Sequence, residues 1–189
     1  MFELDDIHEL LRILNNGGLI LYPTDTIWGI GCDATNEAAV ARVHEVKQRM
    51  TGKGYVLLAN DTAMVNDYVA HFHPKIQTLL SFHKRPLTLV YDQGVNLPDN
   101  VLAPDGSVAF RIPQDNFCKD LIHYFGKPLV ATSANISNEP FPAFFGEVSS
   151  AIISAVDYVV RYRRNDRQFC EPSIIARLGE NEELEFLRH

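Results

Sequence analysis

Residues 19–33, LILYPTDTIWGIGCD, decide the fold. Their apolar beginning predicts a buried strand that ends at Pro23, because proline cannot donate a hydrogen bond to a neighbouring strand. Hydroxyl and carboxyl side chains follow at Thr24, Asp25 and Thr26. The glycines after them suit a backbone that bends or approaches another group closely. Ligands of α/β sheets bind at strand ends, so this stretch predicts a binding site or a capped turn. For so short a polar run taken alone, the turn is favoured.

Strand and helix patterns alternate from this stretch toward both ends of the chain. Helical spacing of apolar residues predicts helices at 5–16, 36–48 and 115–125, with mostly helical structure between 60 and 83. Apolar runs predict further strands at 55–59, 87–91, 107–112, 128–132, 157–162, 173–178 and 183–188. Strands interleaved with helices predict an α/β domain. The close spacing of the last strands predicts a mixed sheet rather than a purely parallel one.

The composition limits the class of protein. A chain of 189 residues suffices for one domain, which we expect to cover residues 1–189. Its 46% hydrophobic and 22% charged residues are ordinary for a soluble globular protein, and no apolar run is long enough to span a bilayer. The acidic amino terminus does not suit a secretory signal and the three scattered cysteines suggest no disulfide framework, so we expect a cytoplasmic protein. The net charge of -7 argues against a general nucleic-acid scaffold but leaves room for a local basic pocket.

Three cations, Lys47, Arg49 and Lys53, stand at or just after the end of a predicted helix. Cations are favourable near a helix carboxyl terminus, and on local evidence this structural explanation is preferred. The functional explanation is that they hold a polyphosphate, with lysine as a mobile point charge and arginine as a bidentate fork. The chain contains no GxxxxGKS or GxxxxGKT sequence, so a phosphate site here is not a P-loop.

Polar side chains also gather at the end of the strand predicted at 128–132. The strand runs directly into Thr132, Ser133, Asn135 and Ser137. Small hydroxyl and amide groups in this position can bind phosphate oxygens or an amino-acid carboxylate, or they can cap the next turn.

One arginine lies inside an apolar strand pattern, SVAFRIP at 107–113. Alternation along a strand places Ser107, Ala109 and Arg111 on the same face. An arginine that faces inward is costly unless it is paired, so we expect it to meet a carboxylate. A ligand's carboxylate and the protein's own are equally open at this point.

Other sequence patterns give less information about function. The basic run at 161–167 contains one tyrosine, and a solvated edge is favoured over an RNA contact because the whole chain is acidic. The GxGxxA sequence at 29–34 begins too far after its strand for a dinucleotide site. The histidines show no convincing zinc spacing, and no GxSxG or Cys/His signature indicates covalent catalysis.

Taken together and in this order, the segments resemble the YrdC-like family and, within it, the short threonylcarbamoyl-AMP synthases. The resemblance covers nearly the whole chain, through YPTDTIWGIGCDA (22–34), KQR (47–49), RPLTLV (85–90), SVAFRIP (107–113), TSANIS (132–137), EPSII (171–175) and FLR (186–188). The pairing of Lys47-x-Arg49 with Ser133-x-Asn135 resembles the KxR and SxN tetrad of that family.

This resemblance implies a single α/β domain in which a twisted mixed sheet with flanking helices folds around a deep basic cavity. It implies a nucleotidyltransferase that converts L-threonine, bicarbonate and ATP, the last with Mg²⁺, into threonylcarbamoyl-AMP and pyrophosphate. It implies that a tRNA-modifying transferase complex then uses the product to modify adenosine in tRNA, and it allows a weak contact of this chain with tRNA. It implies no membrane and no tightly bound, protein-ligated metal.

The same resemblance assigns roles to single residues. The threonine-binding positions are Thr26, Arg111, Thr132 and Ser173. The ATP-binding positions are Lys47, Arg49, Lys53, Ser107, Ser133, Asn135 and Arg188. The tetrad residues Lys47, Arg49, Ser133 and Asn135 act by electrostatics and positioning, because attack of a carbamate oxygen on the α-phosphorus needs no protein nucleophile. We expect ATP binding to depend on Lys47 and Arg49 together, and Arg111 to be a ligand residue rather than part of a structural ion pair.

The chain departs from the family pattern at several positions. Lys84-Arg85-Pro86 stands where the family often has proline-glycine-proline, Gly54-Tyr55 and Leu58 stand where it often has proline-leucine and a histidine, and Asn138 replaces a glycine. These departures affect the threonine pocket more than the ATP side. We expect threonine as the best substrate, serine as a weaker one and valine as almost unused.

Two alternatives to the synthase remain open. One is a YrdC-like protein that binds RNA or assists ribosome assembly without making an adenylate. The other is a paralogue that adenylates the carbamate of another small amine.

Overall fold

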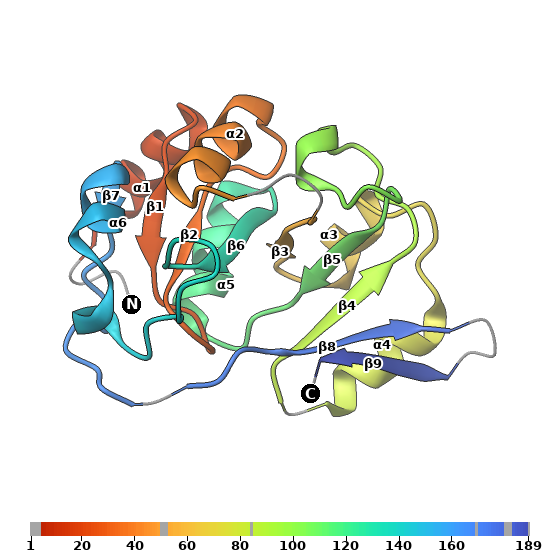
Figure 1. Cartoon of the computed structure of the whole chain (residues 1–189). Coiled ribbons are helices and arrows are strands. Elements are labelled where there is room, and N and C mark those ends of the chain that lie inside the picture. Colours follow the sequence, from red (N-terminus) through yellow and green to blue (C-terminus); the bar gives the residue numbers. More distant parts are fainter. Residues whose placement is uncertain (1–4, 50–52, 84, 169, 180–182, 189) are drawn as a thin grey trace.

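The fold is built on one twisted mixed sheet (Figure 1). A computed structural model describes residues 5–49, 53–83, 85–168, 170–179 and 183–188. Within these residues nine strands lie in the order β7-β1-β2-β6-β3-β5-β4-β8-β9. The pairs β1–β7, β3–β5 and β4–β8 are parallel, and the other neighbours are antiparallel. The predicted α/β class and the predicted mixed sheet are confirmed.

The strands are short, and most lie where apolar runs predict them. Their bounds are β1 Ile20–Tyr22, β2 Gly29–Gly31, β3 Val56–Leu58, β4 Leu87–Tyr91, β5 Val108–Arg111, β6 Leu129–Ser133, β7 Tyr158–Val159, β8 Ile174–Leu178 and β9 Leu184–Arg188. Because β6 runs antiparallel to both β2 and β3, its polar end meets Gly29 on one side.

Helices flank the sheet, and each begins at a side chain that accepts a hydrogen bond from a backbone N–H of its first turn. Their bounds are α1 Ile7–Asn15, α2 Glu37–Val46, α3 Thr62–Asp67, α4 Pro74–Phe82, α5 Asn116–Phe125 and α6 Ser150–Ala155, with single 3₁₀ turns η1 Asp99–Val101 and η2 Phe145–Glu147. The capping residues are Asp6, Asn36, Asp61, His73, Asp115 and Ser149. None of the helices in the described ranges has the length and apolar character needed to cross a bilayer.

Apolar side chains pack in two clusters, and β1 contributes to both. Ile20 and Tyr22 belong to the cluster that also contains side chains of α1 and α5. Leu21 belongs to the larger cluster around β2, β3 and β4. This division follows from the alternation of side chains along a strand. The sheet is therefore held between two apolar layers, and the polar strand ends are left to form a site.

Two elements differ from the prediction. The glycines at 29 and 31 are predicted to let the backbone bend or approach another group closely; Gly29–Gly31 is a regular strand rather than a bend, and the close approach is confirmed. A Cβ on Gly31 would lie 2.6 Å from the Tyr22 ring and 2.8 Å from the carbonyl oxygen of Val130, so glycine is needed for close packing between neighbouring strands. The second difference is α6, a six-residue helix that the apolar pattern does not predict.

Candidate functional site

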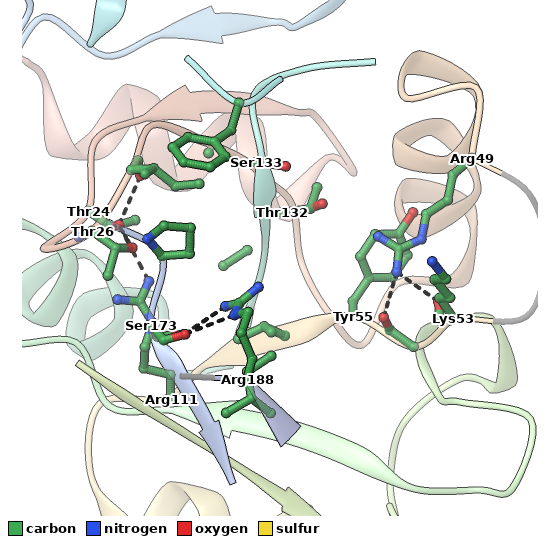
Figure 2. Close-up of a pocket in the computed structure, with 18 residues that line it drawn as sticks. Thr24, Thr26, Arg49, Lys53, Tyr55, Arg111, Thr132, Ser133, Ser173 and Arg188 are labelled. Carbon is green, nitrogen blue, oxygen red and sulfur yellow. Dashed lines mark hydrogen bonds between the residues drawn. The ribbon is translucent and has the colours of Figure 1, made fainter. Parts of the chain in front are cut away.

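A cavity of about 420 Å³ opens where several loops and strand ends meet (Figure 2). The described residues that line it come from several short stretches and from single positions: Thr24, Thr26, Ile27 and Gly29; Arg49; residues 53–56; residues 131–133; Pro172, Ser173 and Ile175; and Arg111, Phe141 and Arg188. Eight of the eleven predicted site residues line it: Thr26, Arg49, Lys53, Arg111, Thr132, Ser133, Ser173 and Arg188. The fold thus brings together most of the residues that the sequence singles out.

One side of the cavity carries two guanidinium groups, those of Arg111 and Arg188 (Figure 2). Arg188 donates from Nε and Nη2 to the carbonyl oxygen of Ser173, at 3.1 and 2.8 Å. Burial and the nearby charge of Arg111 lower the pKa of Arg188 below its ordinary value. The two like charges therefore create a site that favours an anion.

Arg111 has a carboxylate partner inside the protein. It donates to Asp25 Oδ1 at 2.5 Å, and the two side chains are 4% and 10% exposed. The other carboxylate oxygen of Asp25 accepts from the backbone N–H of Gln114 at 3.0 Å. The prediction that Arg111 takes no part in a structural ion pair is therefore wrong, because the loop after β1 places Asp25 directly on the guanidinium. Arg111 still lines the cavity beside this pair.

Hydroxyl groups complete this side. Thr26 Oγ1 lies 2.8 Å from Thr24 Oγ1, and Ser173 Oγ lies 2.7 Å from Thr88 Oγ1. All four residues are buried, with Thr26 and Ser173 each 6% exposed. The hydroxyls are thus held in fixed positions, which suits the recognition of a small polar ligand.

The opposite side carries Arg49, Lys53 and Tyr55 (Figure 2). Arg49 Nη2 donates to the carbonyl oxygens of Lys53 and Gly54, at 3.0 and 2.8 Å. The Arg49 guanidinium lies 4.3 Å from the centre of the Tyr55 ring, and burial lowers the pKa of Arg49. Within the part of the chain that the structure describes, neither Arg49 nor Lys53 forms an ion pair. Their positive charge remains available to a ligand.

Thr132 and Ser133, at the end of β6, lie between the two cationic sides (Figure 2). Ser133 pairs with Gly29 of β2, and a Cβ on that glycine would lie 3.1 Å from the Thr132 carbonyl oxygen. This close contact fixes the end of β6 against the start of β2.

Lys47 does not line the cavity, although it is a predicted ATP ligand. Its side chain is buried, and Nζ donates to the carbonyl oxygens of Ser133 and Asn135 at 2.5 and 2.7 Å. Nζ also lies 3.4 Å from Asn135 Oδ1, so three oxygens surround the ammonium group. Burial, and secondarily the charge of Arg49, lower the pKa of Lys47 to about 8. A direct phosphate contact does not fit this geometry, because Lys47 instead holds the backbone of the SxN segment from behind the cavity wall.

Two other predicted ATP ligands also lie off the cavity wall. Asn135 uses its amide nitrogen to donate to the carbonyl oxygen of Glu139 at 2.6 Å. Ser107 stands at the opposite end of β5 from Arg111, and its backbone N–H donates to Asp105 Oδ1 at 3.0 Å. Four residues of strand separate two positions by about 13 Å, so Ser107 shares a face with Arg111 but not a site.

The departures from the family pattern have different structural outcomes. Leu58 is fully buried in the cluster beneath α1 and α5 and does not line the cavity, whereas Gly54 and Tyr55 do. Arg85 borders a separate cavity of about 600 Å³, and Lys84 lies outside the described residues. Asn138 has a φ of 71°, a left-handed conformation that glycine adopts more easily.

Sequence patterns do not identify the apolar part of the cavity wall. Ile27, Phe141, Pro172 and Ile175 contribute to it. Pro172 and Ile175 lie beside the predicted Ser173, and their nearness in sequence to a site residue could have identified them. Phe141 follows the SxN segment at a distance that no local pattern explains.

The described ranges contain no group of three or more His, Cys, Asp or Glu side chains placed to hold a metal ion. Among the described residues that line the cavity, none is Asp or Glu. Its donor set of hydroxyls and cations therefore suits anions and polar organic groups rather than a directly bound metal.

Known proteins are similar in sequence to most of this chain. Threonylcarbamoyl-AMP synthase of Xanthomonas euvesicatoria pv. vesicatoria is 32% identical over 158 residues, which are 82% of this chain and 84% of that protein. Threonylcarbamoyl-AMP synthase of Vibrio cholerae is 30% identical over 170 residues, which are 88% of this chain and 90% of that protein.

Solved structures share the fold at lower identity. P. abyssi Sua5 complexed with L-threonine gives a TM-score of 0.84 at 24% identity and covers 96% of this chain and 53% of that chain. E. coli YciO gives a TM-score of 0.82 at 19% identity and covers 97% of this chain and 88% of that chain. The chain thus spans about half the length of the P. abyssi protein.

A family model called Sua5/YciO/YrdC and described as telomere recombination matches residues 12–189. The resemblance that the ordered motifs indicate is therefore confirmed, and this chain belongs to the Sua5/YciO/YrdC family.

Proposed function

We propose that this chain is a threonylcarbamoyl-AMP synthase, a nucleotidyltransferase that uses L-threonine, bicarbonate and ATP. The observation that carries the proposal is a single cavity with cations on two opposite sides and hydroxyl groups between them (Figure 2). The two larger substrates each bring an anionic group, the carboxylate of threonine and the triphosphate of ATP. Relatives at 32% and 30% identity bear the name of this activity, which supports the proposal.

The side with Arg111 and Arg188 suits threonine. Of these two guanidinium groups, only that of Arg111 contacts a carboxylate of the described residues, Asp25, so net positive charge remains for the substrate carboxylate. Arg188 uses Nε and Nη2 on Ser173, and Nη1 donates to none of the described residues. The buried hydroxyls of Thr26 and Ser173 suit the amine and the β-hydroxyl of threonine.

The side with Arg49 and Lys53 suits the phosphates of ATP. Arginine and lysine without carboxylate partners stabilise phosphate oxygens by charge-assisted hydrogen bonds. The lining residues that the structure describes include no carboxylate, so Mg²⁺ would enter as part of the MgATP substrate, coordinated by phosphate oxygens and water. Ser133, between the two sides, can donate to a phosphate oxygen near the reacting centre.

The proposed reaction needs charge stabilisation and positioning. The amine of threonine combines with bicarbonate to form a carbamate and release water. A carbamate oxygen then forms a bond to the α-phosphorus of ATP, while the bond from that phosphorus to the bridging oxygen breaks and pyrophosphate leaves. Cations fixed on both sides of this centre stabilise the charge that develops on the phosphoryl oxygens. A rigid cavity keeps the two reactants in contact.

The product is a mixed carbamic–phosphoric anhydride, and a group-transfer reaction must consume it. We propose transfer of the threonylcarbamoyl group to adenosine in tRNA by a tRNA-modifying transferase complex in the cytoplasm. We also propose that this chain makes a weak contact with tRNA. Addition of tRNA should leave the rate of pyrophosphate release unchanged if tRNA binds only to the transferase.

A direct assay tests the synthase proposal. Purified protein is incubated with MgATP, bicarbonate and each proteinogenic amino acid in turn, and pyrophosphate and nucleotide products are measured by mass spectrometry. We expect threonine-dependent pyrophosphate release, the mass of threonylcarbamoyl-AMP, and loss of both when bicarbonate is removed. A product with another amino acid in place of threonine would instead identify a paralogue. The absence of an adenylate with every amino acid would overturn the proposal.

A further inference from the structure

Two aromatic rings border the cavity among the described residues, those of Tyr55 and Phe141, and they differ in what covers them. Tyr55 is 2% exposed; Arg49 lies over its ring and His44 contacts it edge-on, with ring centres 5.0 Å apart. Phe141 is 38% exposed, and within the described chain no ring or cation packs against it. Phe141 therefore has an open aromatic face at the cavity wall.

The backbone on both sides of Phe141 is tethered. Before it, the carbonyl oxygen of Glu139 accepts a hydrogen bond from the side chain of Asn135 at 2.6 Å. After it, the backbone N–H of Ala143 donates to Glu147 Oε2 at 2.8 Å. These two contacts restrict where the Phe141 ring can lie.

The next two aromatic residues anchor the same segment further. The guanidinium of Arg164 lies 5.2 Å from the Phe145 ring centre, and Arg167 lies 5.8 Å from that of Phe144. Trp28 packs against Phe145 with ring centres 4.9 Å apart. The basic run at 161–167 thus holds residues that follow the SxN segment, and Phe141 is not the tip of an unsupported loop.

We propose that Phe141 stacks on the adenine base of ATP and determines the preference of this site for a purine nucleotide. The inference rests on the proposed function. Of the three substrates, only ATP carries an aromatic ring, since threonine and bicarbonate contain none. Ile27, Pro172 and Ile175 add apolar surface to the same cavity, which suits the remaining surface of a base. Tyr55 is excluded from this role because Arg49 already covers its ring.

Calorimetry with two ligands separates stacking from phosphate binding. Wild type, Phe141→Ala, Phe141→Leu and Phe141→Tyr are titrated with MgATP and, separately, with magnesium tripolyphosphate, which has no base. Loss of base–aromatic stacking should weaken MgATP binding by about tenfold to a hundredfold in the Ala and Leu variants. Phe141→Tyr keeps the ring and should bind MgATP as wild type does. All four proteins should bind tripolyphosphate equally.

Tyr124→Ala is the matched control, because Tyr124 is a surface ring, 62% exposed, that does not line the cavity. It should leave both titrations unchanged. Further support would be a fall in the ATP-to-CTP preference in Phe141→Ala but not in Phe141→Tyr.

Two results would overturn the stacking role. One is unchanged MgATP affinity in Phe141→Ala, and the other is an equal loss of MgATP and tripolyphosphate binding, which would mean that the segment had moved. Absence of MgATP binding by the wild-type protein would overturn the proposed function itself, so the two failures are distinguishable.

Discussion

The two sides of the cavity hold their cations in different ways. Arg111 is paired with a buried carboxylate, Asp25, that the protein supplies. On the other side Arg49 donates to carbonyl oxygens, as does Lys47 behind the wall, and no ion pair with a described residue neutralises either charge. Carbonyl oxygens satisfy hydrogen bonds without cancelling a positive charge. The comparison therefore shows that hydrogen-bond satisfaction and charge compensation are separate properties, and that Arg49 depends on a ligand for its anion whereas Arg111 does not.

The largest effect is expected when the paired side is broken. Arg111→Met leaves Asp25 as a buried, unpaired charge and should lower the free energy of unfolding by about 3–5 kcal/mol. Urea unfolding monitored by circular dichroism measures this change. The double variant Asp25→Asn/Arg111→Met removes the orphaned charge and should recover most of the loss. If the single variant were as stable as wild type, the ion pair would contribute nothing to stability.

Lys47 should show the opposite behaviour, because the folded protein disfavours its charge. Burial lowers its pKa to about 8 from an ordinary 10.5. Between these two values the unfolded chain retains the proton and the folded protein does not, so the free energy of unfolding rises with pH across that window. Relative to Lys47→Met, wild type should gain up to about 3 kcal/mol on going from below pH 8 to above pH 10.5.

Denaturant titrations of both proteins across that pH range provide the measurement for Lys47. Other groups that titrate there, such as tyrosines, are common to wild type and Lys47→Met and cancel in the difference. Parallel pH profiles would mean that the ammonium group is not destabilised by burial.

On the side with Arg49 and Lys53, removal of a cation should lower the affinity for MgATP without a comparable loss of stability. Arg49→Ala removes a charged donor and should reduce the affinity for MgATP by about 1.5–3 kcal/mol. Arg49→Lys keeps the charge but not the planar fork, and an intermediate affinity is expected. Calorimetry gives both values, and Arg85→Ala, in the separate cavity, serves as the control. Unchanged affinity in Arg49→Ala would remove this arginine from the phosphate site.

The smallest effect concerns the choice among amino acids on the paired side. Valine lacks the hydroxyl that the buried Thr26 and Ser173 can recognise, so it should be almost unused. Serine lacks only the methyl group, and its specificity constant should be lower than that of threonine by about 1–3 kcal/mol in activation free energy. Competition assays of pyrophosphate release rank the three. If valine matched threonine, the pocket would recognise shape alone, and another amine would have to be the substrate.

Local sequence signals were enough for most of the fold. The strand at 87–91 and the helix at 115–125, which ends at Gly126 with a φ of 74°, lie where apolar spacing and a terminal glycine predict them. The strand at Gly29–Gly31 could not be predicted, because its glycines are required by Tyr22 and by Val130, about a hundred residues further along the chain.

The site could be predicted as a set of residues but not as a set of contacts. Eight of its residues follow from motifs, whereas the partner of each cation depends on how distant loops meet. In the sequence, Asp25 is only a polar residue after a strand. Nothing in its neighbourhood indicates that it forms an ion pair with Arg111. Likewise, a lysine at a helix end does not show that its ammonium group will reach the backbone of Ser133 and Asn135.

The position of Arg188 in β9 has a consequence for protein synthesis. β9 pairs with β8 at one end of the sheet, while β1 to β6 form their pairs without it. A chain emerging from the ribosome folds from its amino terminus, so the segments that carry Arg49, Arg111 and Ser133 can assemble before later residues emerge. The wall that Arg188 completes cannot close until residue 188 has left the exit tunnel. A nascent chain therefore completes its set of cavity cations only after residue 188 has emerged, later than Lys53, Arg49 and Arg111.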